Sequence, residues 1–266
     1  MEITVNEKKM VIDNFTTLFE LRNQIKPDAD VVIINGYQTD TDIKLQEGDK
    51  ISLIRKGEIP DKSEIKYLMM ARHTPGVHDK LQKGFVAIAG LGGLGSNVAV
   101  SLARMGIGTI KLIDFDIVEP SNLNRQQYFI HQIGKSKTEA LKDTLLNINP
   151  YNTYLTENIY ITAENAKKTL KGYDVIIEAF DKAKNKAMLI NECLKHFPGK
   201  CIIGASGVAG VFDTESLKIH KIGKNTYIVG DMVNEARPGC GLMATRVAVA
   251  ANMQAHLAVR YLLGEI

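Results

Sequence analysis

A glycine-rich stretch is the first feature of this sequence that could carry chemistry. Residues 90–96 read Gly-Leu-Gly-Gly-Leu-Gly-Ser, follow an apolar run at 85–89 and precede a helix predicted over 97–105. Glycines let the backbone turn tightly and approach phosphate oxygens, while the start of the helix offers free N–H groups and a favourable dipole. Asp114 ends the next predicted strand, about 20 residues further on, where a carboxylate can bind a ribose hydroxyl. The predicted nucleotide site therefore contains Gly90, Gly92, Gly93, Gly95, Ser96 and Asp114.

These residues do not decide which nucleotide binds. NAD and ATP share the adenosine half, so a nicotinamide-dependent oxidoreductase fits the glycines and Asp114 as well as an ATP-using enzyme does. Glycines between a strand and a helix can also serve only to let the two elements pack closely. The residues that follow Asp114 must separate these readings.

The segment after Asp114 favours ATP. Residues 121–126 read Ser-Asn-Leu-Asn-Arg-Gln, and Lys137 follows Arg125 at a distance of twelve residues. Two cations beside a glycine loop can neutralise the negative charge of a transferring nucleotide, which hydride transfer does not require. The glycine loop, the Asp114-Phe115-Asp116 stretch and the 121–126 segment together closely resemble the ThiF/MoeB family of adenylating enzymes, over residues 65–266.

The resemblance implies a role for each matching residue. The glycine loop would hold the phosphates of ATP, Asp114 and Asp116 would contact the nucleotide, and Asn122, Arg125 and Lys137 would contact the phosphates. The catalytic residues implied in this way are Arg125, Lys137, Asp181 and Arg72. Arg72 is the positional match to an arginine that reaches the phosphates from upstream of the loop.

Asp181 is the predicted Mg²⁺ ligand. It follows the apolar run 175–177, at the strand end where open α/β folds place ligands. The family usually has Thr-Asp-Asn here, and this chain has Phe180-Asp181-Lys182, so the family's asparagine is replaced. An aspartate after a strand also serves commonly as a helix cap, and that alternative stays open.

The cysteine pattern of this chain differs from that of the larger members of the family, which commonly have two C-x-x-C pairs that bind zinc. Cys193, Cys201 and Cys240 show no paired C-x-x-C spacing, so no zinc is expected. Residues 220–236, where the family's crossover loop carries a cysteine, have none. Sulfur would then come from a separate persulfide donor such as a cysteine desulfurase. Cys240, before the last helix, is the one thiol considered for chemistry, against the alternative of a small buried side chain.

The elements that would position these residues form two predicted domains joined by a linker at 57–64. Residues 1–56 alternate short apolar strands (3–5, 10–12, 31–34 and 51–54) with one helix at 17–25, where Leu18, Leu21 and Ile25 have helical spacing. This pattern resembles a ThiS-type β-grasp domain. Its last strand continues into 55–60 without a terminal Gly-Gly, so we expect a docking, dimerisation, regulatory or purely structural role.

A helix is predicted over about 63–72, from the end of the linker into the second predicted domain, 65–266. Apolar runs at 85–89, 110–113, 175–177 and 201–203 then alternate with helical stretches, as in a parallel sheet covered on both faces. Runs at 211–212, 217–220 and 227–229 predict an antiparallel extension, and a helix is predicted over 242–263. The predicted fold is thus a doubly wound α/β sheet, mostly parallel with an antiparallel extension, preceded by a small ubiquitin-like β-grasp domain.

Composition limits the partners. The formal charge of +3 is spread over mixed Lys, Asp and Glu, so no nucleic acid is expected. No secretory signal and no apolar run of about 18 residues are present, which predicts a cytoplasmic protein without a membrane contact. The resemblance and the apolar final helix favour a homodimer.

The sequence therefore predicts an ATP- and Mg²⁺-dependent adenylyltransferase that activates the C-terminal carboxylate of a ThiS-like sulfur-carrier protein, with thiamine biosynthesis as the expected pathway. Three alternatives stay open. The chain could be a nucleotide-binding scaffold of a sulfur-transfer pathway without turnover, an oxidoreductase, or a relative that adenylates a small molecule or a tRNA base.

Overall fold

The computed structural model describes residues 1–6, 8–14, 16–57, 65, 73 and 76–266, and the chain divides into two compact units, Met1–Asp79 and Lys80–Ile266. Most of the predicted linker and of the helix predicted over 63–72, including Arg72, lies outside the described residues. Among the helices of the described segments, none combines the length and the apolar character that crossing a lipid bilayer requires.

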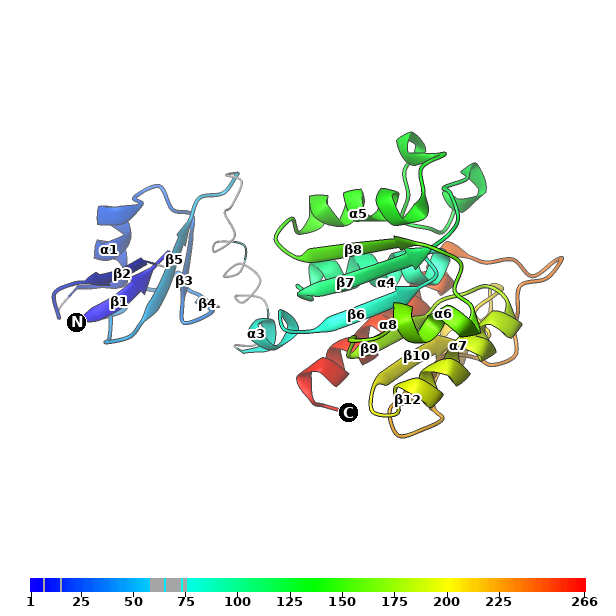
Figure 1. Ribbon diagram of the computed structural model, residues 1–266. Coiled ribbons are helices and arrows are strands. Elements are labelled where there is room, and N and C mark those ends of the chain that lie inside the picture. Colours follow the sequence, from blue (N-terminus) through cyan, green and yellow to red (C-terminus); the bar gives the residue numbers. More distant parts are fainter. Residues whose placement is uncertain (7, 15, 58–64, 66–72, 74–75) are drawn as a thin grey trace. The chain divides into compact units, whose positions relative to one another are not determined.

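The first unit is a small sheet with one helix (Figure 1). Its strands are β1 (Glu2–Val5), β2 (Lys8–Val11), β3 (Val31–Ile34), β4 (Tyr37–Gln38) and β5 (Lys50–Ile54), in the order β2-β1-β5-β3-β4. β1 and β5 are parallel neighbours, and the other pairs are antiparallel. This is the predicted β-grasp arrangement, and its core includes Ile3, Leu21 and Leu53.

Helix α1 (Leu18–Ile25) begins where the sequence predicts it. Thr17 and Glu20 form a reciprocal capping box, which satisfies two N–H groups at the start of the helix. Leu18 and Leu21 are buried, as expected, but Ile25 is 41% exposed. The predicted helical spacing of the three residues is confirmed, and Ile25 is more exposed because the helix ends at this residue.

The second unit contains a seven-stranded sheet of β6 (Phe85–Ala89), β7 (Thr109–Asp114), β8 (Thr153–Asn158), β9 (Val175–Glu178), β10 (Cys201–Ala205), β11 (Lys218–Lys221) and β12 (Thr226–Gly230). The strand order is β11-β12-β10-β9-β6-β7-β8. All neighbours are parallel except β11, which is antiparallel to β12. From β6 the chain adds β7 and β8 on one side and then returns to add β9 on the other. The order therefore reverses between β6 and β9.

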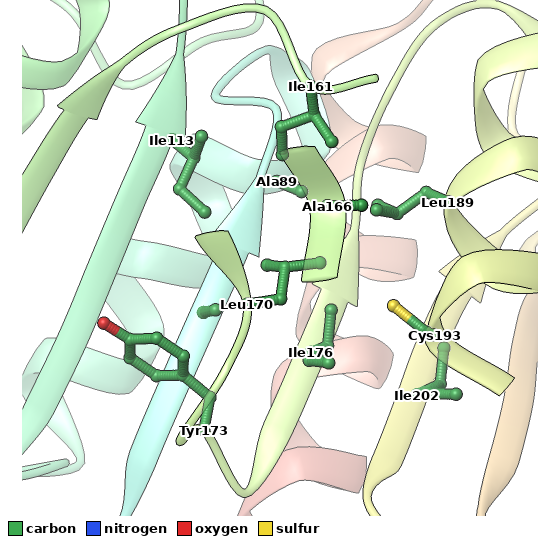
Figure 2. Close-up of a cluster of buried hydrophobic side chains, with 11 residues drawn as sticks. Ala89, Ile113, Ile161, Ala166, Leu170, Tyr173, Ile176, Leu189, Cys193 and Ile202 are labelled. Carbon is green, nitrogen blue, oxygen red and sulfur yellow. The ribbon is translucent and has the colours of Figure 1, made fainter. Parts of the chain in front are cut away.

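Helices cover both faces of this sheet (Figure 1). The helices of this unit are α4 (Gly93–Arg104), α5 (Lys137–Ile148), α6 (Ala163–Thr169), α7 (Ala183–His196) and α8 (Ala244–Leu263). The short helix α3 (Val77–Leu81) spans the division between the units and leads into β6. Short 3-10 turns occupy Pro120–Asn122, Ile130–Gln132 and Thr214–Ser216. α4 packs against α5 and α8, and α6 packs against α7. Figure 2 shows the core beneath α6 and α7, where Ala166 and Leu189 meet the strand residues Ile176 and Ile202.

The predicted fold class is confirmed, with three corrections of detail. The helix after the glycine loop begins at Gly93 and not at residue 97. Residues 211–212 form no strand, and β12 joins the sheet in parallel, so the antiparallel extension is β11 alone. The edge strand β8 was not predicted, because Thr153–Asn158 is mostly polar.

Candidate active site

A cavity of about 580 Å³ lies at the carboxyl ends of β6, β7, β9 and β10, where the strand order reverses. Open α/β folds bind their ligands at this point of the sheet, and the volume is within the ~300–1,000 Å³ of small-molecule sites. Residues from each strand end line it, namely Gly90, Gly92 and Gly93 after β6, Asp114–Ile117 after β7, 179–183 after β9 and 205–209 after β10.

The cavity brings together most of the predicted site residues. Its lining includes Gly90, Gly92, Gly93, Asp114, Asp116, Asn122, Arg125, Lys137 and Asp181. Gly95 and Ser96 do not line it. A Cβ on Gly95 would lie 1.9 Å from the Gly90 carbonyl oxygen, so this glycine permits close packing of the helix behind the loop. The buried Ser96 hydroxyl donates to the Gly92 oxygen (2.7 Å) and accepts from the Gln127 N–H (3.1 Å), which fixes the loop from inside.

The start of α4 faces this cavity with an uncapped end. Gly92 is the N-cap residue and makes no side-chain capping bond, and the first turn contains no acidic residue. The N–H groups of the first turn therefore remain available, and the positive end of the helix dipole adds to them. This arrangement is suited to bind an anion such as a phosphate group.

Asp114 is built into the wall of the cavity. One carboxylate oxygen accepts from the Leu91 N–H (2.6 Å) and the other from the Asp116 N–H (2.9 Å). Because a carboxylate offers about four acceptor positions, Asp114 keeps capacity for a ligand hydroxyl. Tyr128, which the sequence did not single out, donates its hydroxyl to the Leu91 oxygen (2.8 Å). Burial, followed by the charges of Asp114 and Asp116, raises the pKa of Tyr128, so this donor stays protonated.

Lys137 is nearly buried and already has an anionic partner. Its Nζ lies 2.9 Å from a carboxylate oxygen of Asp116, and the residue is 6% exposed. Ser136, the N-cap of α5, fixes the backbone beside it by accepting from the Glu139 N–H. A phosphate that reaches Lys137 must therefore share its charge with Asp116.

Arg125 and Gln126 carry orphaned polar atoms beside the cavity. Arg125 donates through Nη1 to the Ser121 oxygen (3.1 Å) and to Asn124 Oδ1 (2.8 Å), but its buried Nε has no partner among the described residues. The buried Oε1 of Gln126 has none either. Since buried polar atoms in proteins nearly always have partners, these two atoms indicate where a ligand or water completes the site.

Asp181 is exposed, lines the cavity, and forms no hydrogen bond or ion pair with another described residue. The N-cap of α7 is Lys182, so Asp181 does not cap this helix. In the described part of the chain no group of three or more His, Cys, Asp or Glu side chains could hold a metal. Mg²⁺ is commonly bound by one or two carboxylates together with substrate phosphates, and Asp181 fits that mode.

The sequence analysis did not predict the buried ion pair between Lys186 and Glu178, which lies three residues before Asp181 at the end of β9. Glu178 ends β9 with no exposed surface, and Lys186 of α7 approaches its two oxygens at 3.2 and 3.4 Å. Burial raises the pKa of Glu178, against the opposing effects of Lys186 and the Phe180 N–H. Lys186 also lines the cavity. The available signal was a glutamate that directly continues the apolar run 175–177.

The cysteines lie away from the cavity lining. Cys193 and Cys201 are fully buried, and burial raises the pKa of each thiol to about 12. Cys240 is partly exposed, in a turn closed by hydrogen bonds between Arg237 and Cys240.

Comparisons with known proteins agree with this geometry. The model of the ThiF family matches residues 66–266, and a model described as ThiS-like ubiquitin matches residues 1–57. Among curated proteins, the tRNA threonylcarbamoyladenosine dehydratase of Haemophilus influenzae is 36% identical over 154 residues, which are 57% of this chain and 58% of that protein. The adenylyltransferase and sulfurtransferase MOCS3 of Xenopus laevis is 36% identical over 130 residues, 48% of this chain and 28% of that protein. The chain thus spans less than two thirds of either relative.

Solved structures share the fold. The crystal structure of the Escherichia coli tRNA N6-threonylcarbamoyladenosine dehydratase TcdA in complex with ATP has a TM-score of 0.70 and 21% identity, covering 78% of this chain and 98% of that chain. The structure of E. coli MccB with succinimide has a TM-score of 0.58 and 23% identity, covering 78% of this chain and 72% of that chain. At these identities the likeness concerns the fold.

Proposed function

The chain belongs to the ThiF family, and from this premise we propose that the protein transfers the adenylyl group of ATP to a carboxylate and releases pyrophosphate. One observation carries the proposal. A single cavity combines the free start of α4, the Asp114 carboxylate, the cations Arg125 and Lys137, and the unpartnered carboxylate of Asp181. In a hydride-transferring enzyme, Arg125, Lys137 and Asp181 would have no chemical role in this cavity, because hydride transfer needs neither charge neutralisation at phosphates nor a metal ligand.

The chain's residues can support the reaction by binding and charge neutralisation. The N–H groups of the glycine loop and α4 hold the phosphates, Asp114 accepts from the ribose, and Arg125 and Lys137 balance the negative charge of the leaving pyrophosphate. Asp181 would hold Mg²⁺, which supplies further neutralisation when bound. The substrate carboxylate attacks the α-phosphorus as the bond to pyrophosphate breaks. A carboxylate is already ionised at neutral pH, so the step needs no general base.

The substrate we propose is the C-terminal carboxylate of a separate ThiS-like sulfur carrier, in thiamine thiazole biosynthesis. The ThiS-like match of residues 1–57 and the relative named adenylyltransferase and sulfurtransferase support this choice. The chain's own β-grasp unit cannot serve, because β5 is followed by Arg55-Lys56-Gly57 in peptide linkage and not by a free Gly-Gly. Since no cysteine lines the cavity, the sulfur would come from a persulfide donor such as a cysteine desulfurase.

A second candidate is a tRNA-linked carboxylate. The dehydratase relative is 36% identical over 154 residues and takes its name from threonylcarbamoyladenosine, whose threonine part carries a carboxylate. Activation of that carboxylate as an acyl-adenylate would prepare it for loss of water. Both candidates therefore share the adenylation step. They differ in the molecule that carries the carboxylate, which is a protein in the first and a tRNA in the second.

The test is ATP–pyrophosphate exchange by the full chain with Mg²⁺. It is run with a ThiS-like protein ending in Gly-Gly, with tRNA bearing threonylcarbamoyladenosine, and with neither. We expect exchange only with the carrier, and a loss of about 100-fold or more in Asp181→Ala, as for removal of other charge-stabilising groups. Asp143→Ala is the matched control, because Asp143 is exposed, pairs with Lys135 at 3.5 Å and does not line the cavity.

The other outcomes are decisive as well. Exchange that depends on the modified tRNA would establish the second candidate. If the chain binds ATP but exchanges pyrophosphate with neither substrate, the proposed adenylyltransferase activity is contradicted. The alternative of a nucleotide-binding scaffold then remains.

A further inference from the structure

Arg246 occupies an unfavourable place for a cation. It is the third residue of α8 and is 2% exposed. The first turn of a helix carries the positive end of the helix dipole, and burial of a guanidinium requires charged and hydrogen-bonding partners. The hydrogen-bond partners of Arg246 therefore indicate which segments this residue holds in place.

Those partners all lie in the segments between β10 and α8. Nη1 donates to the carbonyl oxygens of Phe212 and Asp213, both at 2.8 Å. Nη2 donates to Ser216 Oγ at 3.0 Å and to Asp231 Oδ2 at 2.7 Å. One buried side chain thus joins two loops that are separated by β11 and β12. We name residues 206–213 and 231–243 the wall loops.

Asp231 extends the connection into the second wall loop. Its carboxylate accepts from the N–H groups of Val233 (2.9 Å) and Asn234 (2.8 Å) and from Asn234 Nδ2 (2.7 Å). Burial alone would raise the pKa of Asp231, but the Asn234 and Val233 donors and Arg246 outweigh it and lower the pKa, so the group is an anion at neutral pH. Gly207 has φ +73°, and a Cβ there would lie 2.1 Å from Asp231 Oδ1.

The wall loops form one side of the cavity. Residues 206–209 and 234–236 line it. In the order β12-β10-β9-β6-β7, residues 206–213 follow β10 and residues 231–243 follow its neighbour β12, whereas Asp114 ends β7 on the other side of the glycine loop after β6. A nucleotide with its ribose at Asp114 leaves the β10 side open for the attacking carboxylate.

We propose that Arg246, together with Asp231, is a positioning residue that shapes the wall receiving the acyl substrate. The inference rests on the proposed adenylation. Arg246 does not itself line the cavity, and its hydrogen bonds go to none of the predicted phosphate ligands, so it acts through the loops that it holds. Its loss should therefore weaken use of the acyl substrate while ATP binding is kept.

The experiment compares Arg246→Met, Arg246→Lys and Asp231→Asn in the full chain. The matched control is Lys111→Met, which removes a partly buried ion pair with Glu157 and a hydrogen bond to the Thr169 oxygen (2.8 Å), away from the cavity lining. Three quantities are measured: amide hydrogen exchange of the wall loops, the Kd of a fluorescent ATP analogue, and the KM of the acyl substrate in pyrophosphate exchange. The acyl substrates are the Gly-Gly carrier and the modified tRNA.

In Arg246→Met we expect faster amide exchange in the wall loops, an unchanged Kd for the ATP analogue, and a KM for the acyl substrate raised about tenfold or more, since a misplacement of ~1 Å can cost ~100-fold in rate. Arg246→Lys should be intermediate, because one ammonium keeps the charge but reaches fewer acceptors. Lys111→Met should leave all three quantities near those of the wild type.

Three results would overturn the proposal: unchanged amide exchange in the wall loops, an unchanged KM, or an ATP-analogue Kd that rises in parallel with the KM. The last would show that Arg246 only supports the fold. If the wild-type chain exchanges pyrophosphate with neither acyl substrate, the proposed function itself fails and the acyl role of Arg246 falls with it. The amide exchange then still shows whether Arg246 holds the wall loops.

Discussion

The charged residues of the cavity differ in how far the protein itself satisfies them. Both oxygens of Asp114 accept backbone N–H groups, and Lys137 is paired with Asp116. Asp181 has no partner among the described residues, and the buried Nε of Arg125 has none. The first two residues are thus held in place before a ligand arrives, and the last two keep unused capacity for one.

Residue burial also predicts the reactivity of the thiols. Cys193 and Cys201 have pKa values raised to about 12 by burial, so at pH 8 only about one part in ten thousand of each is thiolate. Cys240 is partly exposed. With a thiol-specific disulfide reagent at pH 8, we expect one thiol to react in the native protein and three in denaturant. Labelling of Cys193 as fast as Cys240 would contradict the burial of Cys193.

The raised pKa values of Cys193 and Cys201 also make the free energy of unfolding depend on pH. A thiol whose pKa is higher in the folded than in the unfolded chain favours folding while both states are protonated, below about pH 8.5. That contribution is lost as pH rises toward 12, because the unfolded state releases its protons first. Alkaline unfolding of the wild type should therefore begin at lower pH than that of a Cys201→Ala variant with otherwise similar stability at pH 7.

At the scale of elements, the glycine loop shows what a sequence can and cannot predict. Its composition and its place after an apolar run were sufficient to locate the cavity, but not the start of α4 at Gly93, since glycine is a poor helix former. β8 was missed because its exposed edge position removes the apolar pattern. The contacts of Arg246 were missed because its partners lie 15 to 34 residues away along the chain.

Two glycines of this loop should respond differently to the same substitution. In Gly95→Ala the new Cβ would lie 1.9 Å from the Gly90 oxygen, so we expect a loss of about 1–3 kcal/mol in unfolding free energy through overpacking. In Gly92→Ala the nearest neighbour of the Cβ, Gln126 Nε2, is 3.9 Å away, so stability should be kept while binding of the fluorescent ATP analogue weakens. Urea unfolding and analogue titration of both variants provide the check. Equal stability of the two would contradict the close packing of α4 on the loop.

At the scale of the whole molecule, the cavity belongs to one unit. Those of its lining residues that the structure describes fall between Gly90 and Val247, within Lys80–Ile266. We therefore expect a chain of residues 76–266 to bind the fluorescent ATP analogue with a Kd within about threefold of that of the full chain. A much weaker Kd, with the shortened chain still folded by circular dichroism, would assign part of the nucleotide site to the removed residues, which include Arg72.

The same pair of proteins tests the β-grasp unit. If this unit docks the carrier, the shortened chain should show a raised KM for the carrier in pyrophosphate exchange with an unchanged KM for ATP. An unchanged KM for the carrier would favour a regulatory or purely structural role. The missing Gly-Gly after β5 excludes the unit as substrate but leaves these roles to experiment.

The contact between α8 and the glycine loop has a consequence for synthesis of the protein. Val247 lines the cavity, and its Cγ1 lies 3.0 Å from where a Cβ of Gly93 would be. The glycine loop can therefore pack against Val247 only after α8 has been synthesised and has left the ribosome. A parallel sheet with such distant pairings forms late and slowly. A nascent or truncated chain without α8 lacks Val247 in the pocket wall, so we expect nucleotide to stabilise it less than it stabilises the full chain. Nucleotide should then protect the full chain from proteolysis more than it protects such fragments.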